Sequence, residues 1–348
     1  CVEETAFMLK EIREGNPDAK ITLLIATGFH RATTREELVG KFGEEIVDNE
    51  CIAIHDSQDM DAMANIGTLP SGAPLLINKI AANADLLVSE GFIETHFFAG
   101  FSGGRKSILP GVSSKVTVLG NHCSKFIDSP YSRTGILEGN PIHKDMIAAS
   151  KMAHQKYIVN VIIDADKKVV HAVAGDAIEA HAAGCKFLQD YCQVVPKKAA
   201  DIAISTNGGY PLDQNIYQAI KGMTAAEATL PDSGIIIMIA GCRDGHGGVG
   251  FYHNIADVKN PEEFEQKAIH TPRLETVPDQ WTSQIFARIL AHHKVIMISD
   301  LVDPKLVKDM HMELASNVDE ALAMAFKIKG NDAKVAVIPD GSGVVVNI

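Results

Sequence analysis

The chain has 348 residues, 46% of them hydrophobic, and its 32 Lys and Arg against 44 Asp and Glu give a formal net charge of −12. This length allows two domains, each with a core of its own. The acidic balance and the lack of any run of basic residues argue against nucleic acid and against an anionic membrane surface as partners. No apolar run approaches the roughly 18 residues of a spanning helix, so we expect no membrane association.

Cysteine usage indicates a reducing compartment. The six cysteines form no C-x-x-C pair, and no secretory signal pattern is present. We therefore expect a cytoplasmic protein. The sequence begins with Cys1 inside a predicted helix, CVEETAFMLKEI, and we expect it to be an N-terminally truncated form of a longer chain.

Short β-branched runs predict strands that alternate with amphipathic segments along the whole chain. The predicted strands are residues 21–26, 74–77, 85–88, 157–163, 201–205, 234–240, 294–299 and 334–338. Most are apolar on both faces, as in a parallel sheet with helices on both sides. The pattern predicts an α/β fold with two doubly wound, Rossmann-like domains and a cleft between them.

Local signals suggest helix starts and domain boundaries. Thr34 with Glu37 has the pattern of a capping box, and Asp213 can cap a helix over residues 215–221. A proline and two lysines near residues 193–199 indicate one boundary, and a second break falls near 329–332. We expect one domain to consist of residues 1–192 and 332–348 and the other of residues 198–328.

Two histidines follow predicted strands, where ligands bind in open α/β sheets. His30 lies in ATGFHR, and His96 lies in SEGFIETHFFAGFSGGRKS. Glycines and aromatic residues flank both, a setting in which an imidazole of near-neutral pKa can serve as general acid or base. Two such groups, one on each side of a substrate, would suit an isomerase. The alternative for each is an ordinary solvated loop histidine.

The segment GFSGGRKS, residues 100–107, is similar to a phosphate-binding loop. A Walker A motif requires Gly-Lys-Ser, and Arg105 stands where the last glycine belongs, which argues against a P-loop nucleotidase. Anion binding by backbone N–H groups, with charge from Arg105 or Lys106, remains open beside an ordinary glycine turn. Lys106 precedes Ile-Leu-Pro and could also be a partly desolvated amine open to covalent attachment. A nucleotide-dependent phosphotransferase stays the alternative function.

His122, in GNHCSKF, is the natural metal candidate. No second ligand follows at the spacing of three or four residues found in zinc helices. A metal there would need ligands from a distant loop or from a cofactor.

The helix after STNGGYP places Tyr217, Gln218 and Lys221 on one face, because residues three and four apart are neighbours. An ammonium, an amide and a hydroxyl can bind a small carboxylate that carries a hydroxyl group. The alternative is a solvated helix face. Trp281 opens the segment WTSQIFARIL, and such a residue packs in a core or hinge more often than it contacts a substrate.

Five blocks together resemble the nickel-dependent lactate racemase family, over essentially the whole chain. They are ATGFHR, GFIETHFFAGFSGGRKSILPG, GNH, STNGGYPLDQNIYQAIKGMTAAEAT and PDQWTSQIFARIL. The resemblance implies an isomerase with a nickel-pincer nucleotide, a pyridinium mononucleotide whose two sulfur atoms and one ring carbon hold nickel. It implies a covalent bond from this cofactor to Lys106 and nickel ligation by His122.

The resemblance also implies roles for the remaining candidates. His30 and His96 match the two acid/base histidines of the family. The implied substrate-binding residues are Gln218, Lys221, Tyr217 and Trp281, and the implied contacts of the cofactor phosphate are Ser102, Gly103, Gly104 and Arg105.

The implied reaction interconverts L- and D-lactate by proton-coupled hydride transfer through a pyruvate intermediate, with one histidine serving each enantiomer. Residues 1–192 and 332–348 would bind the cofactor, although their domain lacks its first strand, and residues 198–328 would bind substrate and close. The enzymes that make the cofactor are implied as transient partners. Alternatives are a racemase or epimerase of another short 2-hydroxy acid, or an inactive truncated relative, because the family's Asp-His-Thr-Arg-Pro segment is not in this sequence.

Overall fold

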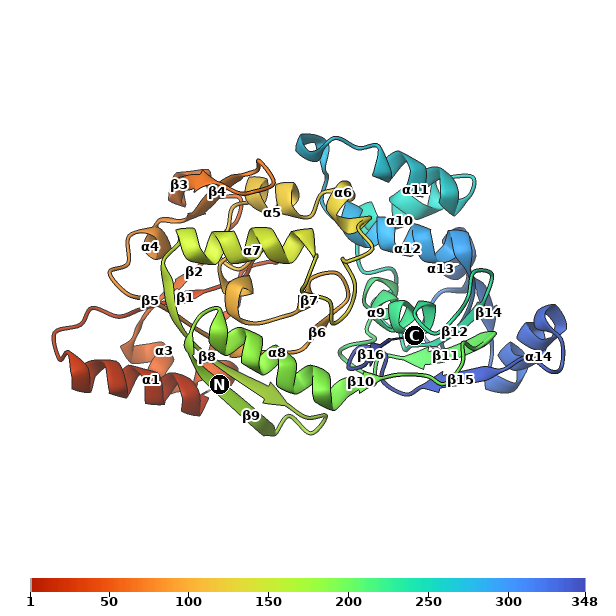
Figure 1. The fold of residues 1–348 in the computed structure, drawn as a ribbon, viewed down its shortest axis with the longest axis horizontal. Coiled ribbons are helices and arrows are strands. Elements are labelled where there is room, and N and C mark those ends of the chain that lie inside the picture. Colours follow the sequence, from red (N-terminus) through yellow and green to blue (C-terminus); the bar gives the residue numbers. More distant parts are fainter. Residues whose placement is uncertain (1, 348) are drawn as a thin grey trace. The chain divides into compact units, whose positions relative to one another are not determined.

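The computed structural model describes residues 2–347, which divide into two compact units (Figure 1). The first unit comprises residues up to 94, 102–121 and 141–188. The second comprises residues 95–101, 122–140 and 189–347. The chain therefore crosses from one unit to the other after residues 94, 101, 121, 140 and 188.

The first unit contains short sheets covered by helices. Its strands are β1 (Thr22–Ile25), β2 (Cys51–Ile54), β3 (Met63–Thr68), β4 (Pro74–Asn78), β5 (Leu87–Phe92), β8 (Gln155–Ile163) and β9 (Val169–Asp176). Its helices are α1 (Val2–Gly15), α2 (Arg35–Phe42), α3 (Glu44–Asn49), η1 (Met60–Ala62), α4 (Lys79–Ala82), η2 (Gly104–Ser107), α5 (Lys115–Asn121), α7 (Pro141–Met152) and α8 (Glu179–Cys192). β1 pairs with β2 and β5 pairs with β8 in parallel, whereas β9 is antiparallel to β8 and β4 to β3.

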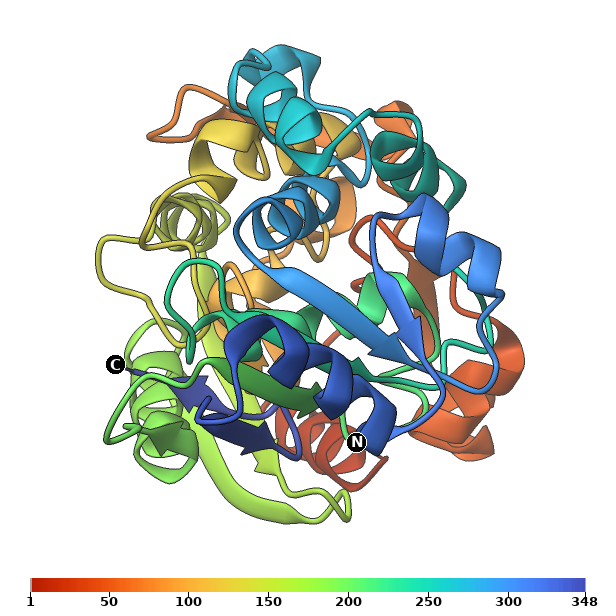
Figure 2. The ribbon, with the colours of Figure 1, turned by 90° about the vertical axis from the view of Figure 1, so that its right-hand side faces the viewer.

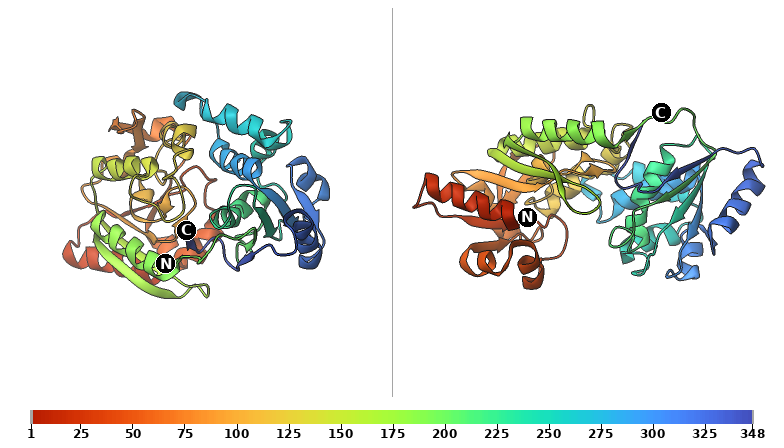
Figure 3. Two further views of the ribbon diagram at one scale, coloured as in Figure 1. Left: turned by 45° about the vertical axis from the view of Figure 1, so that its right-hand side comes forward. Right: turned by 90° about the horizontal axis from the view of Figure 1, so that it is seen from below.

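Two clusters of apolar side chains form much of the core of this unit. Leu9, Leu38, Phe42 and Ile46 join α1, α2 and α3 to the face of β1 and β2. α8 lies along β8 and β9, as Figure 3 shows. It approaches so closely that a Cβ at Gly184 would lie 3.1 Å from a side-chain carbon of Val173 in β9.

The second unit is built on one five-stranded parallel sheet in the order β14-β13-β12-β11-β15. Its strands are β6 (Thr95–His96), β7 (Gly100–Phe101), β10 (Gln193–Val194), β11 (Ile202–Thr206), β12 (Ile235–Ile239), β13 (Lys294–Ile298), β14 (Glu313–Ala315), β15 (Val335–Ile338) and β16 (Val345–Val346). Its helices are α6 (Ser124–Ile127), α9 (Ile216–Glu227), α10 (Val249–Ala256), α11 (Pro261–Ile269), η3 (Arg273–Glu275), α12 (Gln280–His292), α13 (Pro304–Asp309) and α14 (Val318–Lys329).

Helices cover both faces of this sheet. Side chains alternate between faces along a strand; Ile202 and Ile204 pack with Ala321 and Ala325 of α14, which lies across the sheet in Figure 2. Ser205, one residue on, donates to the carbonyl of Gly222 in α9 on the opposite face. Helices on both faces explain why the strands are apolar throughout.

The structure confirms the predicted α/β class, and all eight predicted strands exist with ends shifted by at most four residues. The capping box of Thr34 and Glu37 is present.

Three details of the fold differ from the prediction. Asn215, not Asp213, caps α9, and residues 74–78 pair antiparallel with β3. β15, expected to rejoin the N-terminal domain, pairs with β11; the other predicted boundaries stay a prediction.

Candidate active site

The strand order of the second unit has one topological switch point, between β11 and β15. From β11 the chain adds β12, β13 and β14 on one side, and then α14 leads back to β15 on the other. Ligands in such sheets bind beyond the carboxyl ends of the strands at this point. Here Asn207 bridges to Asp340 and the Thr206 hydroxyl donates to the carbonyl of Pro339, so the two strand ends are joined.

The helix that follows β11 carries three of the predicted residues. Tyr217, Gln218 and Lys221 lie in α9, and all three are partly buried. Asn215 caps the helix by accepting from the Gln218 N–H at 2.9 Å. Asp213 instead accepts from the Gly241 N–H at 2.8 Å, which ties the loop after β11 to the loop after β12.

Tyr217 lies against the first turn of α12. Burial raises the pKa of its phenol to about 12, and Thr282, Asp279 and Trp281 interact with its hydroxyl. Its ring packs edge-on against Phe251, with centroids 5.3 Å apart. The phenol therefore stays protonated at neutral pH and can donate a hydrogen bond.

A continuous series of ring contacts links two predicted histidines to Trp281. His96 contacts Phe98 at a centroid distance of 4.5 Å, Phe98 contacts His122 at 5.1 Å, and His122 contacts Trp281 at 5.2 Å. His122 and Trp281 are buried, at 5% and 7% exposed. Residues far apart in the sequence thus meet within the second unit.

Hydrogen bonds hold the segments that carry these rings. Asn140 donates to the carbonyls of Phe98 and Ile136, at 2.9 and 3.0 Å. Nδ1 of His96 accepts from the Ala99 N–H at 3.2 Å. In the neutral imidazole the proton then resides on Nε2, which is therefore a hydrogen-bond donor.

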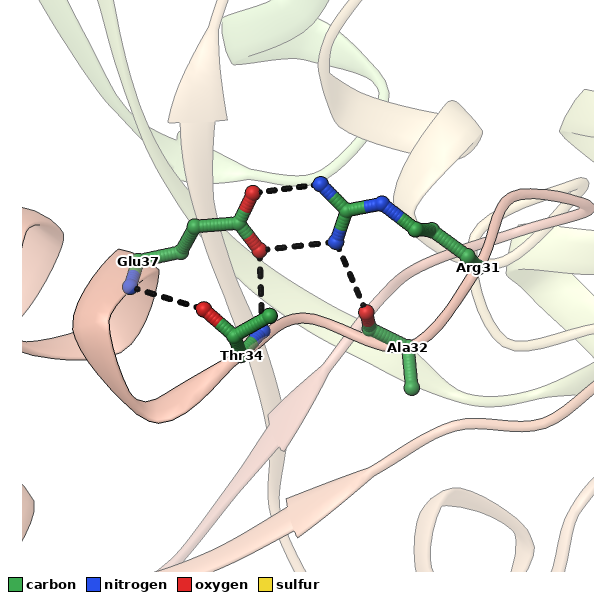
Figure 4. Close-up of polar contacts among 4 residues, drawn as sticks. All are labelled: Arg31, Ala32, Thr34 and Glu37. Atoms are coloured by element: carbon green, nitrogen blue, oxygen red, sulfur yellow. Dashed lines mark hydrogen bonds and ion pairs between the residues drawn. The ribbon is translucent and has the colours of Figure 1, made fainter.

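His30 follows β1 in the first unit and is exposed. Its N–H donates to the carbonyl of Thr27, whose hydroxyl donates to the carbonyl of His55. After it, Arg31 pairs with Glu37 through two hydrogen bonds of 2.9 and 2.6 Å, next to the capping box of α2 (Figure 4). The backbone on both sides of His30 is therefore anchored.

Two backbone hydrogen bonds connect the His30 loop with the Lys106 loop. The Gly111 N–H donates to the carbonyl of Lys106, and the Gly28 N–H donates to the carbonyl of Gly111, both at 2.9 Å. Lys106 itself lies in the short helix η2 and is partly buried. The first unit thus brings together the backbone segments of a predicted acid/base residue and the predicted attachment site.

Arg105 differs from the other cationic candidates. Its side chain is fully buried. Nε donates to Nδ1 of His143 at 3.0 Å, and Nη1 lies 3.1 Å from Nε2 of His181. In this structure the guanidinium is directed into the first unit, which does not fit the predicted direct contact with a phosphate.

Sequence reasoning missed four residues around these loops, of which His55, Asn160 and His181 are buried and His143 is partly buried. His143, His181 and Asn160 surround residues 102–105, and His55 places Nε2 3.0 Å from the carbonyl of Ser113. His55 directly follows β2, so the strand-end rule could have found it. No local signal marks the other three, which contact the loop across 38, 76 and 56 positions.

Within residues 2–347, no group of three or more His, Cys, Asp and Glu side chains is arranged to hold a metal ion. In the same part of the chain, no helix combines the length and the apolar character needed to cross a bilayer.

Comparison with known families identifies the chain. The model of the lactate racemase N-terminal domain matches residues 4–135, and that of the lactate racemase C-terminal domain matches residues 195–346. The chain belongs to the lactate racemase family. It is therefore an isomerase, and the family resemblance predicted from the sequence is confirmed.

Two curated relatives are similar over nearly the whole chain. Lactate racemase from Lactiplantibacillus plantarum is 60% identical over 342 residues, which cover 98% of this chain and 80% of that protein. Lactate racemase from Thermoanaerobacterium thermosaccharolyticum is 56% identical over 339 residues, which cover 97% and 79%.

Solved structures show the same fold. The lactate racemase apoprotein from T. thermosaccharolyticum aligns with a TM-score of 0.98 at 54% identity, covering 99% of this chain and 82% of that one. A Thermotoga maritima protein aligns with a TM-score of 0.69 at 16% identity, covering 97% and 89%, and shows a similarity of fold alone.

Proposed function

We propose that this protein is a lactate racemase that interconverts L- and D-lactate. The observation that carries the proposal is the 60% identity with a curated lactate racemase over 98% of the chain. The clustering of His96, His122, Tyr217 and Trp281 in one unit supports it, because a racemase needs acid/base and binding groups around one carbon atom. We assign no phosphotransferase activity to the glycine loop.

We further propose that the cofactor is a nickel-pincer nucleotide attached to Lys106, with His122 as the nickel ligand. The residues fit such a group in two respects. His122 offers an imidazole, which suits nickel, and its ring is buried against Phe98 and Trp281. Lys106 lies on a loop of glycines with positive φ at Gly103 and Gly104, where backbone N–H groups can approach a phosphate.

The cofactor would supply an acceptor that takes the hydrogen of the substrate Cα together with its electron pair and returns it to either face. His30 and His96 would each take or give the hydroxyl proton of one enantiomer. With Nδ1 accepting from the Ala99 N–H, the protonated Nε2 of His96 would give a proton to the substrate oxygen, and taking one would require Nδ1 to release that hydrogen bond.

Lys221 and Gln218 would bind the substrate carboxylate, since a charge-assisted hydrogen bond from an ammonium is the strongest that this helix face offers. Tyr217 would act as a neutral donor, because burial raises its pKa to about 12. Trp281 would close one wall and exclude water, which strengthens each of these polar contacts. Of the predicted contacts of the cofactor phosphate, Gly103 would serve, because the N–H groups of Ser102 and Gly104 donate to Glu94 and Asn160.

The test is racemisation by the full chain co-expressed with the enzymes that make the cofactor, which we propose as transient partners in the cytoplasm. L-Lactate should yield D-lactate, and the intact mass should show an adduct on Lys106 with nickel bound. Bound nickel without racemisation of lactate would overturn the proposed substrate. A panel of short 2-hydroxy acids would then distinguish a different substrate from an inactive relative.

A further inference from the structure

A network of polar side chains, three of them buried and one partly buried, surrounds the loop that carries Lys106. It consists of Arg105 from the loop itself, Asn160 from β8, His143 from α7 and His181 from α8, and we call these four residues the Arg105 network. Arg105 and Asn160 are 0% exposed and His181 is 2% exposed. These contacts are made by side chains and are separate from the backbone pairing of β5 and β8.

The network holds the loop backbone directly. Oδ1 of Asn160 accepts from the Gly104 N–H at 2.8 Å, and Nε2 of Gln155 donates to the Gly104 carbonyl at 3.2 Å. Nε2 of His181 lies 2.9 Å from the carbonyl of Ser102. Both polar groups of the Gly104 backbone are therefore fixed two residues before Lys106.

The fit is also steric. A Cβ at Gly104 would lie 2.6 Å from the His181 ring, and a Cβ at Gly103 would lie 2.9 Å from Oδ1 of Asn160. Both glycines have positive φ, 75° at Gly103 and 51° at Gly104. Only this backbone conformation, without side chains, can lie so close to the two network residues.

Charge explains why two histidines belong to the network. A buried guanidinium is costly unless its N–H groups are bonded to acceptors. Burial and the adjacent Arg105 lower the pKa of His143 to about 4 and of His181 to about 3, so both rings are neutral, and Nδ1 of His143 accepts from Nε of Arg105. Nη1 also lies 3.3 Å from the Gly103 carbonyl, which adds a further anchor to the loop.

We propose that Asn160, His143 and His181 are positioning residues that act with Arg105 to direct the Lys106 amine toward the cofactor. This inference rests on the proposed attachment at Lys106. Such an attachment would join Nζ to a thiocarboxyl carbon of the cofactor: a C–N bond would form as one C–O and one N–H bond break, and the hydroxyl and the proton would leave as water, so no oxidant or reductant would be required. The Arg105 guanidinium then serves the loop and does not contact the phosphate.

The experiment compares Asn160→Leu with Asn160→Asp in the full chain, co-expressed with the cofactor-making enzymes. Asn160→Leu removes the acceptor of the Gly104 N–H, whereas a protonated Asp retains both hydrogen bonds of the amide. We expect the fraction of chains with the Lys106 adduct to fall about tenfold in Asn160→Leu and to remain near wild type in Asn160→Asp. His181→Phe, which keeps a ring without its nitrogens, should lose adduct as well.

Asp176→Ala is the matched control for stability. Asp176 accepts from the N–H groups of Ile178 and Glu179 at the start of α8, the helix of His181, and it does not contact the loop. This variant should lower Tm but leave the adduct fraction unchanged. Equal adduct loss in Asp176→Ala and Asn160→Leu, or a normal adduct fraction in Asn160→Leu, would overturn the proposal.

A second readout needs no cofactor. The rate of acetylation of Lys106 by acetic anhydride, relative to the exposed Lys267, should change at least threefold in Asn160→Leu and not in Asp176→Ala, because the amine moves to a different environment. If wild type forms no adduct, the proposed cofactor attachment fails, and this labelling still decides whether the network positions Lys106. An unchanged ratio in Asn160→Leu would refute the positioning role.

Discussion

The imidazole of His122 packs edge-on against the indole of Trp281, with ring centroids 5.2 Å apart and an interplanar angle of 78°. Phe98 makes a second edge contact with the same imidazole, at 5.1 Å and 79°. An imidazole held by two such contacts cannot rotate without losing them. The orientation of the proposed nickel ligand is therefore set by aromatic packing.

Trp281→Ala should release the His122 ring. We expect a loss of about 3–5 kcal/mol in unfolding free energy from the cavity, together with a lower nickel content after co-expression. Urea denaturation and metal analysis would measure the two effects. Phe286→Ala is the matched control, because Phe286 lies in the same helix, is fully buried and packs against Phe251. Equal nickel loss in both variants would show that general destabilisation is the cause.

His30→Asn and His96→Asn should each reduce kcat by at least about 10²-fold, since asparagine keeps polarity but cannot exchange a proton near neutral pH. Initial rates from each lactate enantiomer, with the Lys106 adduct quantified by mass, would measure this. His253→Asn is the control, because this exposed histidine pairs with Asp257 in α10. Full activity of either site variant would refute the scheme of two bases.

Lys221→Met should raise KM for lactate about tenfold or more, because a hydrogen bond from a charged donor to the carboxylate is lost. The cofactor adduct should be unaffected, as Lys221 and Lys106 belong to different units. Steady-state kinetics should show the raised KM in Lys221→Met and an unchanged KM in the exposed control Lys267→Met. An unchanged KM would remove Lys221 from the substrate site.

The ion pair of Glu227 and Arg288, whose side chains are 18% and 13% exposed, ties α9 to α12, the two helices that carry Lys221 and Trp281. Its two hydrogen bonds measure 2.8 and 2.7 Å. Burial alone would raise the pKa of Glu227, but Arg288 holds it below its ordinary value. Glu227→Leu should therefore cost about 3 kcal/mol, because it leaves a mostly buried cation without its partner.

The double variant Glu227→Leu with Arg288→Met should recover most of that loss, because apolar side chains of similar volume can replace a buried ion pair. Urea denaturation of both single variants and the double variant gives the coupling free energy. Additive effects would show that the pair does not connect the helices energetically.

The Arg31 and Glu37 pair predicts a pH dependence of stability. Hydrogen bonds from Arg31 and from the Thr34 N–H lower the pKa of Glu37 from 4.5 to about 2. A lowered folded-state pKa stabilises the fold above the unfolded value and loses this effect as pH falls toward 2. The difference in urea midpoint between wild type and Glu37→Gln should thus be constant near neutral pH and shrink below 4.5. A difference that grows on acidification would contradict this sign.

Much of the fold follows from sequence periodicity, because parallel strands covered on both faces are apolar throughout and their ends coincide with glycine-rich loops. The same rule predicts His30 and His96 as site residues, and both stay predictions. The cap of α9 was assigned to the wrong residue, since Asp213 and Asn215 have similar capping propensity and only tertiary structure shows that Asp213 bonds to Gly241.

The surroundings of Arg105 could not be predicted. The motif suggested a cation next to a phosphate, and local sequence does not tell whether a guanidinium turns outward or inward. That choice depends on His143 and His181, which reach it from helices formed much later in the chain. The residues that chemistry would use are therefore easier to read from sequence than the residues that orient them.

Because the chain passes several times between the two units, the units cannot be separated by cutting the gene at one point. Residues 95–101 and 122–140 come from the first half of the gene, yet they supply the second unit with Phe98 and His122, the partners of Trp281. A fragment beginning at residue 189 would encode the five-stranded sheet without these side chains. The two halves of the gene are consequently not interchangeable. In a chimera of two relatives, residues 95–101, 122–140 and the C-terminal half should all come from the same parent, so that the aromatic side chains still fit one another.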